Sequence, residues 1–198
     1  ASVGRIGEIF KQEPTVSDKD ASPDVTVANG SIEFRNVTFK YDDSASKNIL
    51  ENINLSINSG ETIGIIGGTG SSKSTLIQLI PRLYDAQEGE VLVGGRNVKD
   101  YTFKNLRNEI SVVLQQSTLF SGTIMDNIRY SKLDATDEEI IEASKAVCAH
   151  DFIMSFPDGY NTEVTEGGSS LSAGQKQLIA FARTLIADPA ILILDEAT

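Results

Sequence analysis

Two segments that lie far apart in the chain carry residues suited to binding phosphate and a metal ion. An apolar run at residues 63–66 leads into a loop of small residues with one lysine: Gly67, Gly68, Thr69, Gly70, Ser71, Ser72, Lys73, Ser74 and Thr75. The template is G-x-x-x-x-G-K-[ST], in which backbone N–H groups curl around phosphate oxygens and the next helix offers its positive end. We expect Lys73 to reach the β- and γ-phosphates and the Ser74 hydroxyl to ligate magnesium.

One position of this loop departs from the template, because Ser72 stands where glycine is expected. A serine is acceptable at the start of a helix if its backbone is near-helical, and it can even cap that helix. It is costly if the backbone needs a conformation that only glycine adopts easily, or if phosphate must approach closely. We expect this departure to lower catalytic competence more than nucleotide binding.

The second segment is an apolar strand that ends in two carboxylates, Asp195 and Glu196. Residues 191–194 have the pattern of a fully buried parallel strand. Such a strand would hold the carboxylates rigidly at the carboxyl edge of the sheet, where open α/β sheets bind ligands. We expect Asp195 to orient magnesium through a water, and Glu196 to act as general base on the attacking water.

The rest of the chain alternates strand and helix patterns, which predicts an α/β fold. Strands are expected at residues 31–39, 49–57, 61–66, 90–93, 110–114 and 191–194. Helices are expected at residues 76–83, 103–108, across 122–156 with Thr136 as N-cap, and from about Ser172 to Asp188-Pro189. This order predicts a P-loop core with a parallel sheet, an N-terminal antiparallel β layer and an inserted helical subdomain at about 116–165.

Composition excludes several classes of partner. A chain of 198 residues with 40% hydrophobic and 23% charged residues suits one domain with a small subdomain. Its net charge of −11 argues against nucleic acid as a partner, since that needs basic patches. No apolar run approaches the roughly 18 residues of a membrane span. We interpret the single cysteine, Cys148, as a core thiol and the single histidine, His150, as a helix-cap or packing residue.

A third segment, Leu171-Ser172-Ala173-Gly174-Gln175, precedes the acidic strand. With the phosphate loop before it, it resembles the signature of the nucleotide-binding domain of an ATP-binding cassette (ABC) transporter. The connecting segments resemble the exporter branch of that family. The resemblance implies that Ser172, Ala173, Gly174 and Gln175 face the γ-phosphate of an ATP held by a partner subunit.

The resemblance assigns three further residues. Gln115, followed by Leu119-Phe120, matches the glutamine that touches magnesium and the attacking water, although Gln116 leaves the register open by one residue. Tyr41 matches the aromatic residue that stacks on adenine. Glu166 lies in a segment similar to the one that touches the membrane domains in exporters.

The resemblance also implies a complete functional assignment. ATP and Mg²⁺ would be the ligands, with Glu196, Lys73 and Gln115 catalytic and with Ser74, Gln115 and Asp195 at the metal. The partners would be a second nucleotide-binding domain, identical or different, and transmembrane domains at the cytoplasmic face of the plasma membrane. Residues 1–25 would be a connector and linker from a transmembrane domain. Residues 26–198 would be a nucleotide-binding domain that is incomplete after its acidic strand, so these 198 residues alone should show little ATP turnover.

Three other interpretations stay open at this stage. Ser72 fits a degenerate regulatory half of a heterodimeric exporter, which binds ATP and barely hydrolyses it, whereas Glu196 argues against that reading. A soluble ATPase of DNA repair or chromosome structure shares these motifs, but such proteins insert long coiled coils after the phosphate loop. The segment following the loop here is short and lacks sustained heptads. The third is a non-binding interaction fragment.

Overall fold

A computed structural model of the chain describes residue 10 and residues 14–113, 118–165 and 167–195. The chain divides into two compact units, Ala1–Arg107 and Asn108–Thr198. Residues 1–9 and 11–13 of the predicted connector and linker lie outside the described residues, as do Gln115, Gln116, Glu166 and Glu196. In the part of the chain that is described, no helix has the length and apolar character needed to cross a bilayer.

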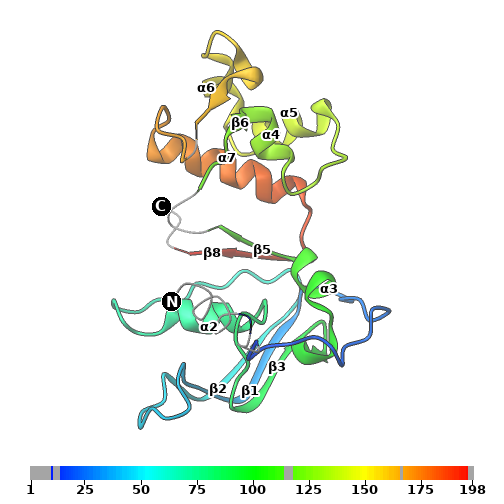
Figure 1. Cartoon of the computed structure of the whole chain (residues 1–198), viewed down its shortest axis with the longest axis vertical. Coiled ribbons are helices and arrows are strands. Elements are labelled where there is room, and N and C mark those ends of the chain that lie inside the picture. The colour runs from blue at the N-terminus through cyan, green and yellow to red at the C-terminus, as the bar shows by residue number, and fades with distance from the viewer. Residues whose placement is uncertain (1–9, 11–13, 114–117, 166, 196–198) are drawn as a thin grey trace. The chain divides into compact units, whose positions relative to one another are not determined.

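The first unit is built on a four-stranded antiparallel sheet (Figure 1). Its strands follow the order β2-β1-β3-β4. Their bounds are β1 (Ile32–Phe39), β2 (Leu50–Ile57), β3 (Glu88–Val93) and β4 (Arg96–Asn97). The register of β1 shifts near Asn36, and Gly89 lies opposite, where a Cβ atom would be 2.3 Å from the Arg35 carbonyl oxygen. The predicted antiparallel layer is therefore confirmed, with a bulge that requires a glycine on the facing strand.

Between residues 14 and 108, where the structure describes the chain without a gap, there are also three short helices: α2 (Lys73–Leu79), η1 (Val98–Asp100) and α3 (Phe103–Asn108). The predicted helix at 76–83 is thus shorter and starts earlier. Leu79 and Ile80 are buried, whereas Leu83 is exposed beyond the end of α2. The chain turns at Arg82, which has a φ of 51°.

The polar segment before the sheet is fixed to this unit by hydrogen bonds. The Asp18 carboxylate accepts from the backbone N–H of Phe103 at 2.8 Å. The Asn105 amide donates to the carbonyl oxygens of Pro23 and Val25 at 2.7 and 2.9 Å. The segment that reads as a linker in the sequence is therefore tied to the start of α3 along its described length.

The prediction of a strand at residues 61–66 is wrong. The structure assigns no regular secondary structure to residues 61–68, and Ile66 is 99% exposed. A strand needs a neighbour for its backbone hydrogen bonds. Among the described residues, none of the paired strands takes this segment as a partner, so its apolar residues do not enter a sheet.

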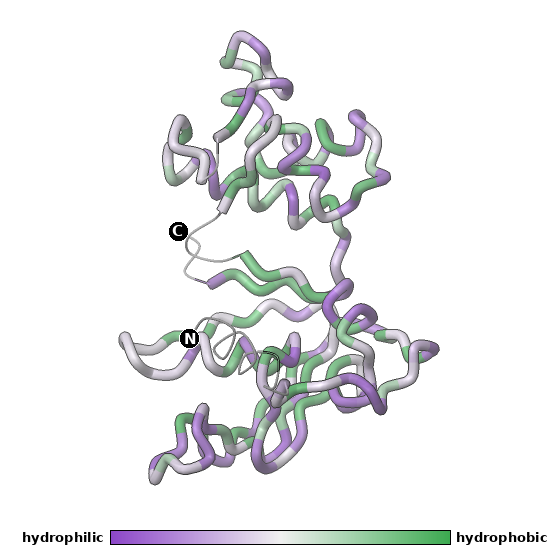
Figure 2. The backbone as a smooth tube through the Cα atoms, in the orientation of Figure 1, coloured by the Kyte–Doolittle hydropathy of each residue, from purple (hydrophilic) through white to green (hydrophobic). Residues whose placement is uncertain are grey.

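The second unit contains the predicted parallel pair. Strand β5 (Ile110–Val113) pairs in parallel with β8 (Ile191–Leu194), with Ile110 opposite Ile191 and Val113 opposite Leu194. Both strands are hydrophobic apart from Ser111 in β5 (Figure 2). The expectation that β8 is fully buried is wrong, because Leu192 and Leu194 are 52% and 50% exposed and only the alternate residues are buried. Strand β5 contacts the long helix α7, and β8 buries one of its two faces.

The segment predicted as helical from residue 122 to 156 begins as a strand and divides into three helices. Its elements are β6 (Gly122–Thr123), α4 (Ile124–Arg129), α5 (Asp137–Ala146) and α6 (His150–Met154), followed by η2 (Gly159–Asn161) and β7 (Glu163–Val164). Helices α4 and α5 pack against α7 (Ala173–Ile186), as Figure 1 shows. A buried cluster that includes Ile128, Ile140, Ile153 and Ile179 joins these helices.

The helix starts follow local capping rules. Thr136 is the N-cap of α5, as predicted, and its hydroxyl accepts from the Glu139 N–H while the Glu139 carboxylate accepts from the Thr136 N–H. Thr123 and Asp126 form the same capping box at α4. The Thr123 hydroxyl and backbone N–H hold the pKa of the Asp126 carboxyl below its ordinary value.

Cys148 is not a core residue. It is exposed and has a φ of 59°, in the left-handed region that ends many helices. It forms the turn between α5 and α6, where the Ala149 N–H reaches back to the Ser144 carbonyl at 2.7 Å. His150 packs as expected, since its Nδ1 lies 3.0 Å from the Tyr160 hydroxyl.

The side chain of Asn127 organises the segment that enters α4. It is 2% exposed, and its amide donates to the carbonyl oxygens of Phe120 and Thr123 at 2.9 and 3.0 Å. Its oxygen accepts from the Phe120 N–H and from the Arg183 guanidinium at 2.9 and 3.0 Å. Arg183 belongs to α7, so these bonds tie the segment 118–127 to that helix.

Replacing Asn127 with alanine should therefore destabilise the second unit. We expect a loss of about 3 kcal/mol in the free energy of unfolding, because each buried polar group left without a partner costs about 1–3 kcal/mol. Urea unfolding followed by circular dichroism measures this loss. The matched control is Asn161→Ala, since Asn161 is exposed. Equal unfolding midpoints for the two variants would contradict the role of Asn127.

Candidate functional site

The predicted phosphate loop wraps around the lysine side chain at the start of α2. The Lys73 ammonium donates to the carbonyl oxygens of Gly67 and Gly68 at 2.7 and 3.2 Å. The loop closes on itself through the Ser71 N–H, which donates to the Gly68 carbonyl at 3.2 Å. A Cβ atom on Gly67 would lie 2.5 Å from the Ser71 hydroxyl oxygen, so a larger residue there would require the Ser71 side chain to move. The loop is exposed from residue 61 to 71.

Ser72 adopts a backbone conformation that glycine adopts easily and serine does not, which is the costly case considered in the sequence analysis. It is the N-cap residue of α2, with φ 64° and ψ 22°, in the left-handed region. Its side chain makes no capping hydrogen bond to the helix, so the possible capping role is not realised. An L-residue in this region is disfavoured by about 1–2 kcal/mol, which is why glycine is the expected residue.

Tyr41, predicted to stack on adenine, lies beside the phosphate-loop helix. Its hydroxyl is 2.9 Å from the Thr75 hydroxyl and 3.2 Å from the Gln78 side-chain oxygen. Its ring packs edge-on to Phe39 and Tyr84, with centroids 4.9 and 5.0 Å apart, and Tyr41 remains 53% exposed. The structure therefore brings Tyr41, Lys73, Ser74 and Thr75 into one unit, although the first two are 32 positions apart in the sequence.

The sequence reasoning missed the contribution of Gln78 and Tyr84 to this arrangement. Gln78 lies on α2 three residues after Thr75, so helical spacing could have placed their side chains on one face. Tyr84 follows α2 on an irregular segment, and no periodic signal indicates that its ring meets Tyr41. That contact depends on the turn at Arg82.

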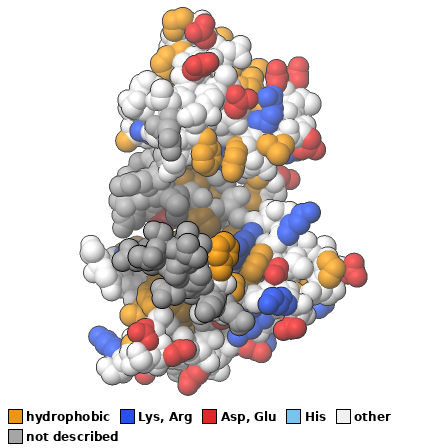
Figure 3. Space-filling view, in the orientation of Figure 1, with side chains coloured by type: hydrophobic (Ala, Val, Ile, Leu, Met, Phe, Trp, Pro, Cys, Tyr) orange, Lys and Arg blue, Asp and Glu red, His pale blue; other side chains and the backbone are white. Residues whose placement is uncertain are grey.

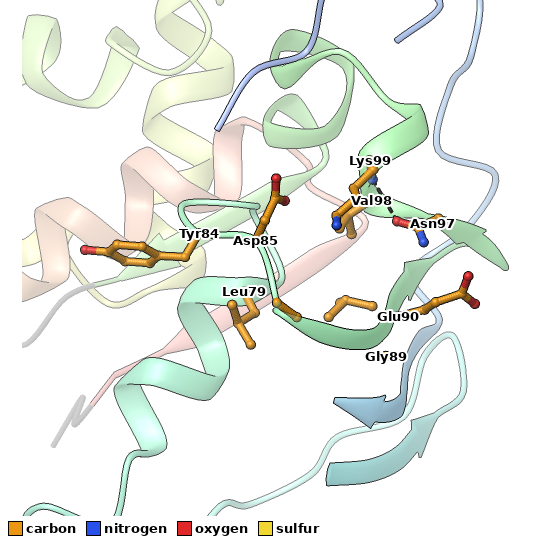
Figure 4. A pocket seen from close by; sticks show the side chains of 10 residues that line it. Leu79, Tyr84, Asp85, Gly89, Glu90, Asn97, Val98 and Lys99 are labelled. Atoms are coloured by element: carbon orange, nitrogen blue, oxygen red, sulfur yellow. Dashed lines mark hydrogen bonds between the residues drawn. The ribbon is translucent and has the colours of Figure 1, made fainter. Parts of the chain in front are cut away.

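A small pocket lies behind Tyr84 and is too small for a nucleotide. Figure 4 shows Tyr84 and Asp85 on the segment after α2, with Asn97, Val98 and Lys99 across the pocket. Its volume is about 10 Å³, which is room for about one water molecule. The open surface around the phosphate loop and the ring of Tyr41 is therefore the better candidate for a nucleotide.

The other predicted site residues belong to the second unit. Asp195 follows β8, and its N–H donates to the Val113 carbonyl at 2.9 Å, which places it at the carboxyl edge of the parallel pair. Gln115, which follows β5 by two residues, and Glu196 lie outside the described residues, as does Glu166. Within the described ranges, no three His, Cys, Asp or Glu side chains gather as a metal cluster.

The signature segment forms the start of α7. The helix starts where the sequence predicts, at about Ser172, which is its N-cap and whose hydroxyl accepts from the Gln175 N–H at 3.2 Å. The Gln175 side-chain oxygen accepts from the Ser172 N–H at 2.9 Å, which completes a capping box. Ser172, Ala173 and Gly174 are exposed, so this helix start is open to an external ligand. A helix of 14 residues presents a positive N-terminal end to anions.

The chain is similar to known transport proteins over its whole length. A family model described as ABC transporter matches residues 50–198. A putative multidrug export ATP-binding/permease protein of Bacillus subtilis (strain 168) is 48% identical over all 198 residues, which cover 34% of that protein. A protein of the same description from Staphylococcus aureus (strain NCTC 8325 / PS 47) is 45% identical over 193 residues, 98% of this chain and 33% of that protein.

The fold also matches a solved structure. A bacterial Atm1-family ABC exporter with ATP bound has a TM-score of 0.92 and 37% sequence identity, with 99% of this chain and 34% of that chain covered. The chain thus spans about a third of the length of these relatives.

The left-handed conformation of Ser72 leads to a stability prediction. We expect Ser72→Gly to raise the free energy of unfolding by about 0.5–1 kcal/mol, because relief of about 1–2 kcal/mol of backbone strain exceeds the added entropy of the unfolded chain. Urea unfolding of the whole chain measures the change. The neighbouring Ser71→Gly substitution is the control and should lower stability, since Ser71 has no positive φ. A Ser72→Gly variant that unfolds earlier than the unmodified chain would show that the serine is not strained.

Proposed function

Because this chain belongs to the ABC transporter family, we propose that it is the ATP-binding part of an exporter that couples ATP hydrolysis to transport across a membrane. The observation that carries this proposal is the phosphate loop curled around the Lys73 ammonium at the start of α2. ATP-binding domains of this family are ATPases. The relatives named for multidrug export support the direction of transport.

We propose that ATP binds along the first unit, with its phosphates in the loop 67–75 and its adenine on Tyr41. The Lys73 ammonium already lies inside the loop, where it bonds to two carbonyl oxygens. Phosphate oxygens carry charge and are stronger acceptors than carbonyl oxygens, so they would take over this donor. The exposed ring of Tyr41 offers a flat surface on which a purine can stack.

Catalysis would use Ser74, Gln115, Asp195 and Glu196. Ser74 and Asp195 supply hard oxygen groups of the kind that Mg²⁺ prefers, and Gln115 would join them. When bound, the metal would neutralise charge on the β- and γ-phosphates. Glu196, the residue after Asp195, would accept a proton from the attacking water.

The exposed start of α7 supports a head-to-tail pair of such domains. Ser172, Ala173, Gly174 and Gln175 would face the γ-phosphate of ATP held by a second nucleotide-binding domain. ATP binding would close the pair, and hydrolysis would reopen it.

Residues 1–25 would connect to a transmembrane domain. Residues 26–198 would form the nucleotide-binding part, with its helical subdomain at about 116–165, and Glu166 would face the membrane domains. The site would then lie at the cytoplasmic face of the plasma membrane.

Acidic side chains are spread over the visible face rather than gathered into one patch (Figure 3), which suits a protein partner better than nucleic acid.

Nucleotide binding can be tested on the 198-residue chain by titration calorimetry. We expect saturable MgATP binding that Lys73→Ala weakens by about 10–100-fold, because hydrogen bonds from a charged donor contribute about 1.5–3 kcal/mol. The control is Lys47→Ala, which removes an exposed lysine from the same unit. Circular dichroism confirms that each variant is folded. A folded chain that ignores MgATP would favour the non-binding interpretation.

A regulatory half-site is the second candidate, and the left-handed backbone of Ser72 favours it. The intact transporter that contains this chain separates the two possibilities. If this site hydrolyses ATP, Glu196→Gln should lower its ATPase rate by about 10²–10⁴-fold, the range typical of a general base. The control Glu138→Gln changes an exposed carboxylate at the start of α5. A rate that hardly responds to Glu196→Gln would identify the site as regulatory.

A further inference from the structure

The side chain of Gln87 pairs with the backbone of Lys40 through two hydrogen bonds. The Gln87 side-chain oxygen accepts from the Lys40 N–H at 2.9 Å, and the Gln87 side-chain nitrogen donates to the Lys40 carbonyl oxygen at 2.9 Å. A backbone N–H can only donate and a backbone carbonyl can only accept. The pairing therefore fixes both the orientation of the Gln87 carboxamide and the direction of each hydrogen bond.

This pairing extends the antiparallel sheet of the first unit by one residue. Strand β1 ends at Phe39 and β3 begins at Glu88, and the backbone N–H of Gln87 donates to the Thr38 carbonyl oxygen at 3.1 Å. A glutamine side chain carries the same donor and acceptor groups as a peptide unit. The Gln87 carboxamide thus takes the place beside Lys40 that a further residue of β3 would have in a ladder. Lys40 is held against the sheet although it lies beyond the end of β1.

A third hydrogen bond of Gln87 reaches past Tyr41. The Gln87 side-chain nitrogen also donates to the Asp43 carboxylate at 3.1 Å, so its two N–H groups bond on either side of Tyr41. The Lys40 ammonium closes the same turn, because it donates to the Asp43 carbonyl oxygen at 2.6 Å. The backbone around Tyr41 is therefore held on both sides, while the Tyr41 side chain stays 53% exposed.

We infer that Gln87 is a positioning residue, which holds the turn at residues 40–43 so that the Tyr41 ring is in place for a nucleobase. This inference rests on the proposed ATP site. Tyr84 lies three residues before Gln87 and packs edge-on against the Tyr41 ring, with centroids 5.0 Å apart. The segment 84–87 thus supports both the ring and the backbone of Tyr41. A platform that is already fixed loses less conformational freedom when a base stacks on it, which strengthens binding.

Two comparisons separate this role from a direct contact between Gln87 and the ligand. Gln87 is exposed, so a direct contact has to be tested. An amide that touched the nucleotide itself would matter whether or not the Tyr41 ring is present. An amide that acts through Tyr41 has no effect once that ring is removed. It also has no effect on a ligand that has a phosphate chain and no base.

The test is a double-mutant cycle on the 198-residue chain, with MgATP and magnesium tripolyphosphate as the two calorimetric ligands. Gln87→Met keeps the length of the side chain and removes its carboxamide, and Tyr41→Ala removes the ring. We expect Gln87→Met to weaken MgATP binding about three- to tenfold, the usual effect of one neutral hydrogen bond. Tyr41→Ala should weaken it at least as much, and Gln87→Met should add no further loss in that background, because both act through the ring. Tripolyphosphate binding should stay unchanged in all three variants.

Two further variants and one structural measurement complete the cycle. Gln177→Met makes the same exchange on α7 and should leave the binding of both ligands unchanged. Gln87→Glu keeps an acceptor for the Lys40 N–H but has no donor when ionised, so it should lose MgATP affinity as Gln87→Met does. It replaces Gln87→Met in the cycle if that variant does not fold. In the chain without ligand, Gln87→Met should speed hydrogen exchange of the Lys40 amide about two- to tenfold by NMR, because that amide loses its acceptor.

The possible outcomes distinguish the two proposals. An unmodified chain that binds neither ligand overturns the proposed ATP site and this inference with it, and normal MgATP binding by Tyr41→Ala overturns the base platform and this inference. Four results overturn only the role of Gln87. They are normal MgATP binding by Gln87→Met, an equal loss of tripolyphosphate binding, losses that multiply in the double variant, and unchanged hydrogen exchange at Lys40.

Discussion

Buried backbone groups need hydrogen-bond partners, and this constraint governs how both units hold their irregular segments. In the first unit, the Arg82 guanidinium is buried and donates to the Ser17 carbonyl at 2.9 Å, while the Arg107 guanidinium donates to the carbonyls of Pro81 and Arg82. In the second, Asn127 and Arg183 satisfy the segment that leads into α4. In these irregular segments, charged and amide side chains thus donate the hydrogen bonds to backbone carbonyls that a neighbouring strand or a helix would otherwise donate.

The same constraint shapes the phosphate loop. Its carbonyl oxygens at Gly67 and Gly68 accept from Lys73, so the lysine that we propose for nucleotide binding also supports the loop without a ligand. The structure is thereby preorganised, because the ammonium is already at the centre of the curl. The loop nevertheless stays exposed, as a site that must admit and release a nucleotide requires.

Ser72 connects the phosphate loop to α2. The loop must turn sharply before α2, and the left-handed backbone at residue 72 makes that turn. The turn is kept although the residue is not glycine, which indicates that the surrounding bonds outweigh about 1–2 kcal/mol of local strain. This strain is the physical basis for considering a regulatory site beside a hydrolytic one.

Features set by neighbouring residues could be predicted from the sequence. The capping boxes at Thr136 and Ser172 follow from residue types three positions apart, and the antiparallel layer follows from short alternating runs. The order of the phosphate loop, the signature and the acidic strand was enough to indicate the family, since each is a contiguous motif.

Features that depend on distant partners could not be predicted in this way. An apolar run such as 61–66 becomes a strand only where another strand accepts its hydrogen bonds, and exposure of Leu192 depends on which face of β8 is covered. The contact between Tyr41 and Thr75 joins residues 34 positions apart, so no local pattern contains it. Hydrogen-bond and packing partners of this kind are chosen when the chain folds, because their energies depend on separation in space and not on separation in sequence.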